Sequence, residues 1–203
     1  MLSPAQLAPY LAFSPELDGD HPAVAALARE LAADQPPARL LIERCFVWVR
    51  DQISHCVDAG REEVPVSASE TLLQGTGFCY AKSHLLAALL RANQLPCSLV
   101  YQRLTWSGEA APFCLHGLNA VYLPELGWYR LDARGNSKPG VYAQFSPPLE
   151  QLAYPVQYPG ECLYPGVYAQ PWPELVRQLR ACASVSAYRA APIDCFPPAK
   201  SDL

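Results

Sequence analysis

The sequence predicts an α+β fold in which helices from the first half of the chain pack on an antiparallel sheet from the second half. Apolar residues recur with the three- to four-residue spacing of helices up to residue 93. Residues 97–104 instead form an apolar and aromatic run typical of a strand, and residues 114–134 alternate in polarity, as strands joined by a tight turn do. The chain has 203 residues, of which 51% are hydrophobic, so it is the size of one domain with a substantial core.

Two amphipathic helices and a short capped turn open the chain. Residues 22–35 and 38–54 each carry apolar side chains at helical spacing. Ser67 and Glu70 stand at the spacing of a capping box, which predicts a short helix that the glycines at 75 and 77 end.

Cys79 is predicted to lie in the first turn of a buried helix over residues 78–93, whose leucines recur every three to four positions and which Pro96 ends. A cysteine is a good nucleophile only as the thiolate, and a helix N-terminus stabilises an anion. The preceding glycines let a substrate carbonyl approach the Cys79 N–H closely. Cys79 is therefore a candidate nucleophile.

The base that activates Cys79 must come from elsewhere in the chain, because His84 lies on another side of the same helix. His21 and His55 border predicted helices, and we interpret both as structural. His116 lies within an alternating strand, on the face that carries the even-numbered residues. His116 is therefore a candidate for the base.

Three strand candidates follow the cysteine helix: 97–104, 114–123 and 128–134. Asp132 on the last of these could orient His116 if the two side chains share a face. Opposed residues in an antiparallel hairpin have a constant sum of numbers, and only an even sum meets that condition. A simple loop of residues 124–127 gives an odd sum, so we predict a turn of odd length or a bulge after Leu123.

The chain is expected to form one domain with three segments: N-terminal helices (1–60), a catalytic core (67–136) and a wrapping segment rich in proline and tyrosine (139–203). The hexapeptide PGVYAQ occurs at 139–144 and again at 165–170. One interpretation is that both copies are Pro-Gly turns leading into short edge strands. The other is that their tyrosines, with Tyr158 and Tyr164, wall a cleft above the site.

Composition excludes several function classes. The 15 basic and 19 acidic residues are scattered and offer no basic stripe to nucleic acid. The N-terminus lacks a leader pattern and no apolar run nears the roughly 18 residues of a membrane span, so we expect a cytoplasmic protein. The eight cysteines contain no C-x-x-C pair, which favours free thiols over a metal site.

Together, three segments resemble the transglutaminase-like superfamily, which has a papain-like core: GTGFC before the helix, HGLNAVYL on one strand and GWYRLD on the next. The similarity extends from about Cys45 to Asn136 and is especially close to a group of bacterial transglutaminase-like proteins of about this length. It implies that Cys79 is the nucleophile, His116 the general base and acid, and Asp132 the residue that orients the histidine.

The resemblance also directs attention to a second oxyanion donor, for which Gln74 and Gln102 are both candidates. The strand departs from the family pattern at Leu118 and Ala120, where an aromatic and an acidic residue are usual. Hydrolysis or small-molecule acyl transfer is therefore favoured over calcium-dependent protein cross-linking.

The sequence thus predicts a cysteine-dependent amide hydrolase or acyl transferase that needs no cofactor or metal and acts on a peptide, an isopeptide or a γ-glutamyl amide. Two alternatives stay open: a non-catalytic peptide-binding module on the same fold, and an arylamine N-acetyltransferase-like enzyme. We expect no nucleic-acid or membrane partner, and the oligomeric state is left open.

Overall fold

The computed structural model describes residues 1–198 of the chain. The helices are, in order, α1 (Pro4–Leu7), the 3-10 turn η1 (Ala8–Tyr10), α2 (Pro22–Leu31), α3 (Ala38–Gln52), α4 (Ala68–Gln74), α5 (Cys79–Ala92), α6 (Pro173–Ala181) and α7 (Val185–Ala190). The strands are β1 (Ser54–His55), β2 (Thr76–Gly77), β3 (Cys97–Thr105), β4 (Phe113–Leu123), β5 (Gly127–Leu131), β6 (Gln144–Ser146), β7 (Leu149–Gln151) and β8 (Cys162–Leu163).

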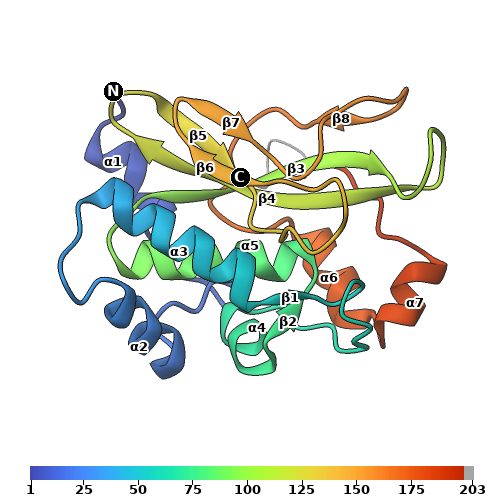
Figure 1. The fold of residues 1–203 in the computed structure, drawn as a ribbon, viewed down its shortest axis with the longest axis horizontal. Coiled ribbons are helices and arrows are strands. Elements are labelled where there is room, and N and C mark those ends of the chain that lie inside the picture. Colours follow the sequence, from blue (N-terminus) through green and yellow to red (C-terminus); the bar gives the residue numbers. More distant parts are fainter. Residues whose placement is uncertain (199–203) are drawn as a thin grey trace.

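The architecture is α+β, as predicted, with helices on one side of an antiparallel sheet (Figure 1). The sheet has the order β5-β4-β3-β8, and each of its pairs is antiparallel. A small hairpin of β6 and β7 lies beside the edge strand β5, whose Tyr129 hydroxyl donates to the Leu149 carbonyl at 2.7 Å. The short parallel pair of β1 and β2 joins the end of α3 to the start of α5.

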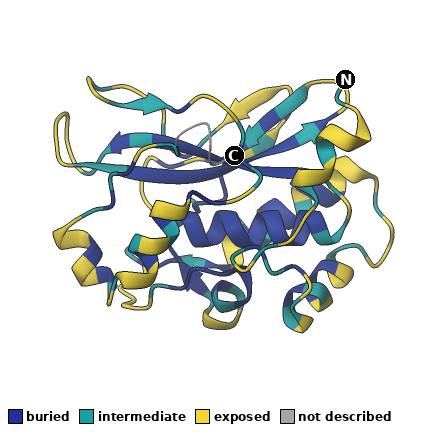
Figure 2. Cartoon of the chain, turned by 180° about the vertical axis from the view of Figure 1, so that it is seen from behind, coloured by how far each residue is buried: buried dark blue, intermediate teal, exposed yellow. Residues whose placement is uncertain are grey.

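Helix α5 is the centre of the core. Every residue from Cys79 to Arg91 is buried, as the continuous dark blue of this helix in Figure 2 shows. A helix that is covered all round needs apolar neighbours on every side, and α5 has α2, α3 and α4 around it and β3 and β4 above it. Its N-terminus is thus fixed firmly where the sheet, β2 and α7 meet.

The hairpin of β4 and β5 has the register that places His116 and Asp132 on one face. Leu123 pairs with Gly127 and Tyr122 with Trp128, so the sum of opposed residue numbers is even and the turn contains three residues. The prediction of a turn of odd length is therefore confirmed. The strand ends at Leu131, earlier than predicted, because the Asp132 carboxylate accepts a hydrogen bond from the Arg134 N–H at 3.0 Å and turns the backbone.

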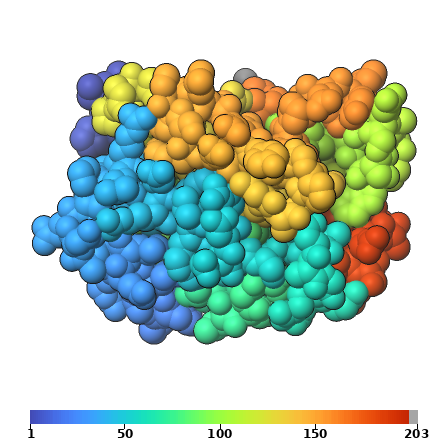
Figure 3. Space-filling model, in the orientation of Figure 1, coloured from blue at the N-terminus to red at the C-terminus, as the bar shows by residue number. Residues whose placement is uncertain are grey.

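The segment after residue 139 wraps the sheet. Both PGVYAQ copies lead into edge pairing, the first into β6 and the second into a bridge between Tyr168 and Leu99. Figure 3 shows the gold and orange surface of this segment above the cyan surface of α3 and the loop that follows it. The first interpretation of the repeat is the one that the register supports.

Among residues 1–198, no helix is long and apolar enough to cross a membrane.

Candidate active site

Cys79 is the first residue of α5, and the backbone before it is shaped to put it there. Gly75 ends α4 in the left-handed conformation, with φ at +66°. At Gly77 a Cβ atom would lie 2.9 Å from the Cβ of Ala81, so only glycine lets β2 pass this close to the first turn of α5. The pair of glycines that the sequence places before the cysteine therefore has a steric cause.

The Cys79 thiol faces a dense set of backbone donors. No side chain caps the N-terminus of α5, so the N–H groups of its first turn have no capping oxygen. The Gly117 N–H on β4 donates to the Cys79 sulfur at 3.4 Å. Donors from the helix and from the strand both favour negative charge on this sulfur.

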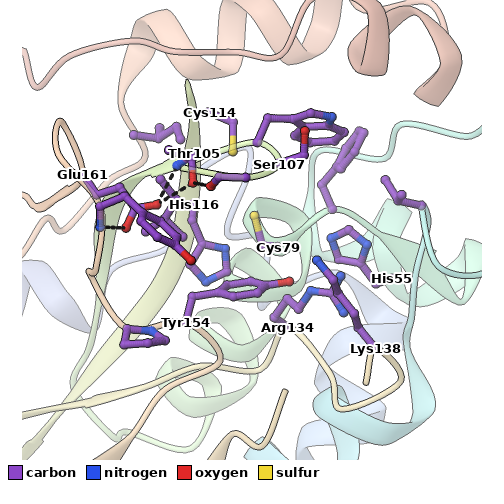
Figure 4. Close-up of a pocket in the computed structure, with 18 of the residues that line it drawn as sticks. His55, Cys79, Thr105, Ser107, Cys114, His116, Arg134, Lys138, Tyr154 and Glu161 are labelled. Atoms are coloured by element: carbon purple, nitrogen blue, oxygen red, sulfur yellow. Dashed lines mark hydrogen bonds between the residues drawn. The ribbon is translucent and has the colours of Figure 1, made fainter. Parts of the chain in front are cut away.

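His116 and Asp132 form a buried pair beside this thiol. The His116 Nε2 and an Asp132 carboxylate oxygen are 2.8 Å apart, and the two residues are 4% and 0% exposed. The carboxylate also accepts hydrogen bonds from the N–H of Arg134 and, at 3.1 Å, from that of Ala153. Because Nε2 is engaged, Nδ1 is the nitrogen that is left for Cys79, which Figure 4 shows beside the ring.

The charges of this group support one another. Burial alone would lower the pKa of His116, but the Asp132 carboxylate and the neighbouring Cys79 raise it to about 10. Burial alone would raise the pKa of Asp132, but its His116 partner and two backbone N–H groups hold it below the usual value. At neutral pH the stable arrangement is therefore a buried carboxylate and an imidazolium, with the sulfur of Cys79 next to them.

The two glutamines predicted as oxyanion donors lie in different places. Gln74 is the exposed last residue of α4 and does not line the cavity that contains Cys79. Gln102 is buried on β3 opposite His116, where its amide nitrogen donates to the Tyr154 carbonyl at 3.2 Å. Gln102 thus positions Tyr154, and the backbone donor that the structure places at the Cys79 sulfur is the Gly117 N–H of β4.

Cys79 and His116 open into a cavity of about 460 Å³, a size that suits a small ligand or a few residues of a peptide. Its other lining residues come from β1, from the ends of β3 and β4, from loops and from α7, and they include His55, Trp106, Arg134, Lys138, Tyr154 and Tyr188 (Figure 4).

Sequence patterns missed the lining residues that lie in loops, since loops carry no periodicity. Of the tyrosines suggested as cleft walls, Tyr158 lines the cavity, whereas Tyr142 is exposed and Tyr164 and Tyr168 are buried in the core. Tyr154 also lines the cavity: its ring meets the His116 ring edge-on, with centroids 5.3 Å apart.

His55 also lines the cavity, although its sequence context indicated a structural role. It packs edge-on against Phe78, at 6.1 Å between centroids. Burial and the nearby Arg134 lower the pKa of His55 to about 3, so its ring is neutral. His84 is buried, and its ring contacts the Val66 carbonyl at 2.7 Å, so it belongs to the packed core.

Lys82 is one turn beyond Cys79 on α5 but serves the scaffold. Its ammonium donates to the carbonyls of Arg50, at 3.1 Å, and Ile53, which lie at the C-terminal end of α3. Within residues 1–198, no group of three or more His, Cys, Asp or Glu side chains is arranged to hold a metal ion.

Comparison with known families places this geometry. The sequence model of the transglutaminase-like superfamily matches residues 25–133, more than half of the chain, and the match includes Cys79, His116 and Asp132. No curated protein matches the sequence.

Two solved structures are similar to this one. A candidate cysteine protease from Cytophaga hutchinsonii has 20% identity and a TM-score of 0.52, covering 66% of this chain and 43% of that one. The periplasmic domain of TgpA from Pseudomonas aeruginosa has 19% identity and a TM-score of 0.49, covering 65% of this chain and 48% of that one. The chain therefore spans less than half of the length of either, and the first likeness is one of fold.

Proposed function

The chain belongs to the transglutaminase-like superfamily, and we propose that it is a cysteine-dependent amide hydrolase or acyl transferase that works through Cys79, His116 and Asp132. One observation carries the proposal. An imidazole bonded to a fully buried carboxylate at 2.8 Å lies beside a cysteine at a helix start, and both open into the same cavity. Nucleophile, base and orienting carboxylate in this arrangement are the requirements of covalent acyl transfer.

The first half of the reaction makes a thioester. The Cys79 thiolate attacks the carbonyl carbon of the amide. The developing oxyanion accepts a hydrogen bond from the N–H at the start of α5. The C–N bond then breaks as the His116 imidazolium gives its proton to the departing nitrogen. The amine leaves, and the acyl group stays on the sulfur.

The second half releases the acyl group. Water attacks the thioester carbon and gives a proton to the now neutral His116, and the C–S bond breaks. The products are a carboxylic acid and the starting pair of thiolate and imidazolium. An amine in place of water makes a new amide, which is acyl transfer. Asp132 keeps the His116 ring in one orientation through both halves and stabilises its charged form.

A peptide, an isopeptide or a γ-glutamyl amide fits the cavity volume and this chemistry. The reaction as written needs neither metal nor cofactor. A cytoplasmic location and the absence of nucleic-acid or membrane partners stay predictions from the sequence.

Detection of the acyl-enzyme tests the proposal. Purified protein is incubated with a small-molecule and peptide extract of cells, quenched in acid and examined by intact-mass spectrometry. We expect an added acyl mass that hydroxylamine removes, since hydroxylamine cleaves thioesters. The adduct should be absent in Cys79→Ala and present in Cys162→Ala, a matched change at a partly exposed thiol outside the cavity.

An adduct that persists in Cys79→Ala would overturn the assignment of the nucleophile. Complete absence of an adduct, with Cys79 unreactive toward alkylating reagents, would favour the peptide-binding module instead.

A further inference from the structure

The cavity around Cys79 has charged residues on two sides. Figure 4 shows Arg134 and Lys138 on the side of His55, and Glu161 on the opposite side. Asp58 also contributes to the lining, next to Arg134. Which of these groups already have all their hydrogen-bond partners within the protein decides which of them can bind a ligand.

Both acids are satisfied by the protein itself. The Asp58 carboxylate accepts two guanidinium N–H groups of Arg134, at 2.5 and 2.9 Å, and the Ser137 hydroxyl at 2.7 Å. The Glu161 carboxylate accepts the backbone N–H groups of Thr105, Gln157 and Tyr158 and the Thr105 hydroxyl, at 2.8 to 3.1 Å. Neither acid is left to bind a cationic group.

The cations are only partly satisfied. Arg134 is 5% exposed and uses two of its five N–H groups on Asp58. Lys138 is exposed, and within residues 1–198 its ammonium has no ion pair and no hydrogen bond. The two cationic groups lie 5.7 and 5.5 Å from the centroid of one ring, that of Tyr154, so this ring holds them together.

We propose that Lys138 and the free N–H groups of Arg134 form a subsite for a carboxylate of the substrate. The substrates are then amides with a free carboxylate a few bonds from the scissile carbonyl. A directional guanidinium beside a mobile ammonium is a pairing that suits a carboxylate. The inference rests on the proposed function, because it assumes that Cys79 is the reacting group.

Two kinds of substrate carry a carboxylate near the bond that breaks. In a γ-glutamyl amide the carboxylate is on the acyl side of the bond that breaks, and in a peptide with a free C-terminus it is on the leaving side. Both bring an anion to the same wall of the cavity.

Two alkylating reagents of similar size test the subsite without knowledge of the substrate. Iodoacetate is an anion and iodoacetamide is neutral, and mass spectrometry gives the rate at which each modifies Cys79. In Lys138→Glu we expect the ratio of the iodoacetate rate to the iodoacetamide rate to fall about tenfold, because a nearby charge is reversed. Lys138→Arg should keep the ratio. Arg29→Glu, on the exposed face of α2 and outside the cavity, makes the same change in net charge and should also keep it.

Protection experiments locate the carboxylate. γ-Glutamylanilide and N-acetylglycylglycine are each compared with their carboxamide derivative as protectants of Cys79 against iodoacetamide. The free acid of at least one pair should protect better than its amide, and Lys138→Glu should remove the difference. An unchanged ratio of rates in Lys138→Glu, or an equal fall in Arg29→Glu, would overturn the subsite.

The two proposals fail differently. If iodoacetamide does not favour Cys79 in the unmodified sequence, the proposed function fails. If it favours Cys79 but the ratio of the iodoacetate rate to the iodoacetamide rate is the same in Lys138→Glu, only the carboxylate subsite fails.

Discussion

Gly117, directly after His116, sets the distance between β4 and the first turn of α5. A Cβ at this position would lie 3.0 Å from the Tyr80 ring and 3.2 Å from the Tyr80 Cα, so any larger residue pushes the helix from the strand. The same closeness lets the Gly117 N–H reach the Cys79 sulfur. Because Gly117 has no side chain, β4 packs close to α5 and its N–H reaches the Cys79 sulfur. This position therefore affects both the packing of the core and the electrostatics of the thiol.

Gly117→Ala should therefore impair the site as well as the fold. We expect a loss of about 1–3 kcal/mol in the free energy of unfolding, from overpacking, and slower alkylation of Cys79 at pH 6. Urea unfolding and mass spectrometry measure the two effects. Gly60→Ala is the control: its φ of +63° strains the backbone, but its Cβ would meet no atom within 4 Å. Alkylation as fast in Gly117→Ala as in Gly60→Ala would contradict this account.

Asp132→Asn should shift the pH dependence of thiol reactivity. The His116 pKa of about 10 means that the imidazolium is present below that pH and is lost above it. Without the carboxylate, burial dominates, the pKa falls, and the imidazolium that stabilises the thiolate is lost at lower pH.

Alkylation of Cys79 in Asp132→Asn should then slow by about tenfold or more at pH 6 and recover toward pH 9. Asp51→Asn removes a carboxylate that pairs with Arg50 outside the triad and should leave the profile unchanged. A parallel drop at all pH values in Asp132→Asn would point to misfolding instead of titration.

Among the elements, those with a repeating pattern were predictable from sequence. The apolar spacing over 78–93 and the alternation over 114–134 are present in the chain itself, so α5, β4 and β5 follow. The even register of the hairpin also follows, because it is required for His116 and Asp132 to share a face. Arg134, Lys138 and Tyr154 could not be predicted as cavity walls, since their loops are placed by tertiary bonds such as that from Ala153 to Asp132.

Glu161 connects one such loop, residues 155–161, to β3 through hydrogen bonds. Burial alone would raise the pKa of Glu161, but the N–H groups of Gln157, Thr105 and Tyr158 hold it at about 2. The carboxylate is therefore charged at neutral pH. Glu161→Ala should release the loop of residues 155–161 from β3 and cost about 1–3 kcal/mol of stability. Hydrogen exchange followed by mass spectrometry should show faster exchange in that loop.

Glu150→Ala provides the matched case, because Glu150 likewise accepts a strand N–H, that of Arg130 at 3.0 Å, but away from the cavity. It should leave residues 155–161 protected. If both variants speed exchange in residues 155–161 equally, Glu161 does not hold this loop specifically, and the interpretation is wrong.

At the scale of the whole molecule, the prediction of one domain depends on how the chain ends are tied to the core. Arg91, fully buried at the end of α5, donates to the carbonyls of Ala12, Cys97 and Ala169 at 2.5 to 3.0 Å. One side chain thus joins the N-terminal segment, β3 and the wrapping segment. No sequence pattern showed this, because the bonds connect residues far apart in the chain.

Arg91→Met should loosen both segments together. Three carbonyls lose their donor, and the buried Cys97 carbonyl loses two bonds, so we expect a loss of about 3 kcal/mol in the free energy of unfolding. Hydrogen exchange should rise in residues 8–17 and 165–172 alike. Arg29→Met, a change at an exposed position of α2, should leave exchange in both segments unchanged. Faster exchange in only one of the two segments would show that the ends are not coupled through Arg91.

The central claim, that His116 activates Cys79, is tested most directly by the selectivity of iodoacetamide at pH 6. Burial raises the pKa of five other thiols, Cys45, Cys56, Cys97, Cys114 and Cys195, to about 11 or 12. The partly exposed Cys162 and Cys182 are the remaining competitors.

Mass spectrometry should show Cys79 labelled at least about tenfold faster than any of these thiols, and His116→Gln should abolish the preference. Slow and uniform labelling of the eight cysteines, or an undiminished preference in His116→Gln, would contradict the account.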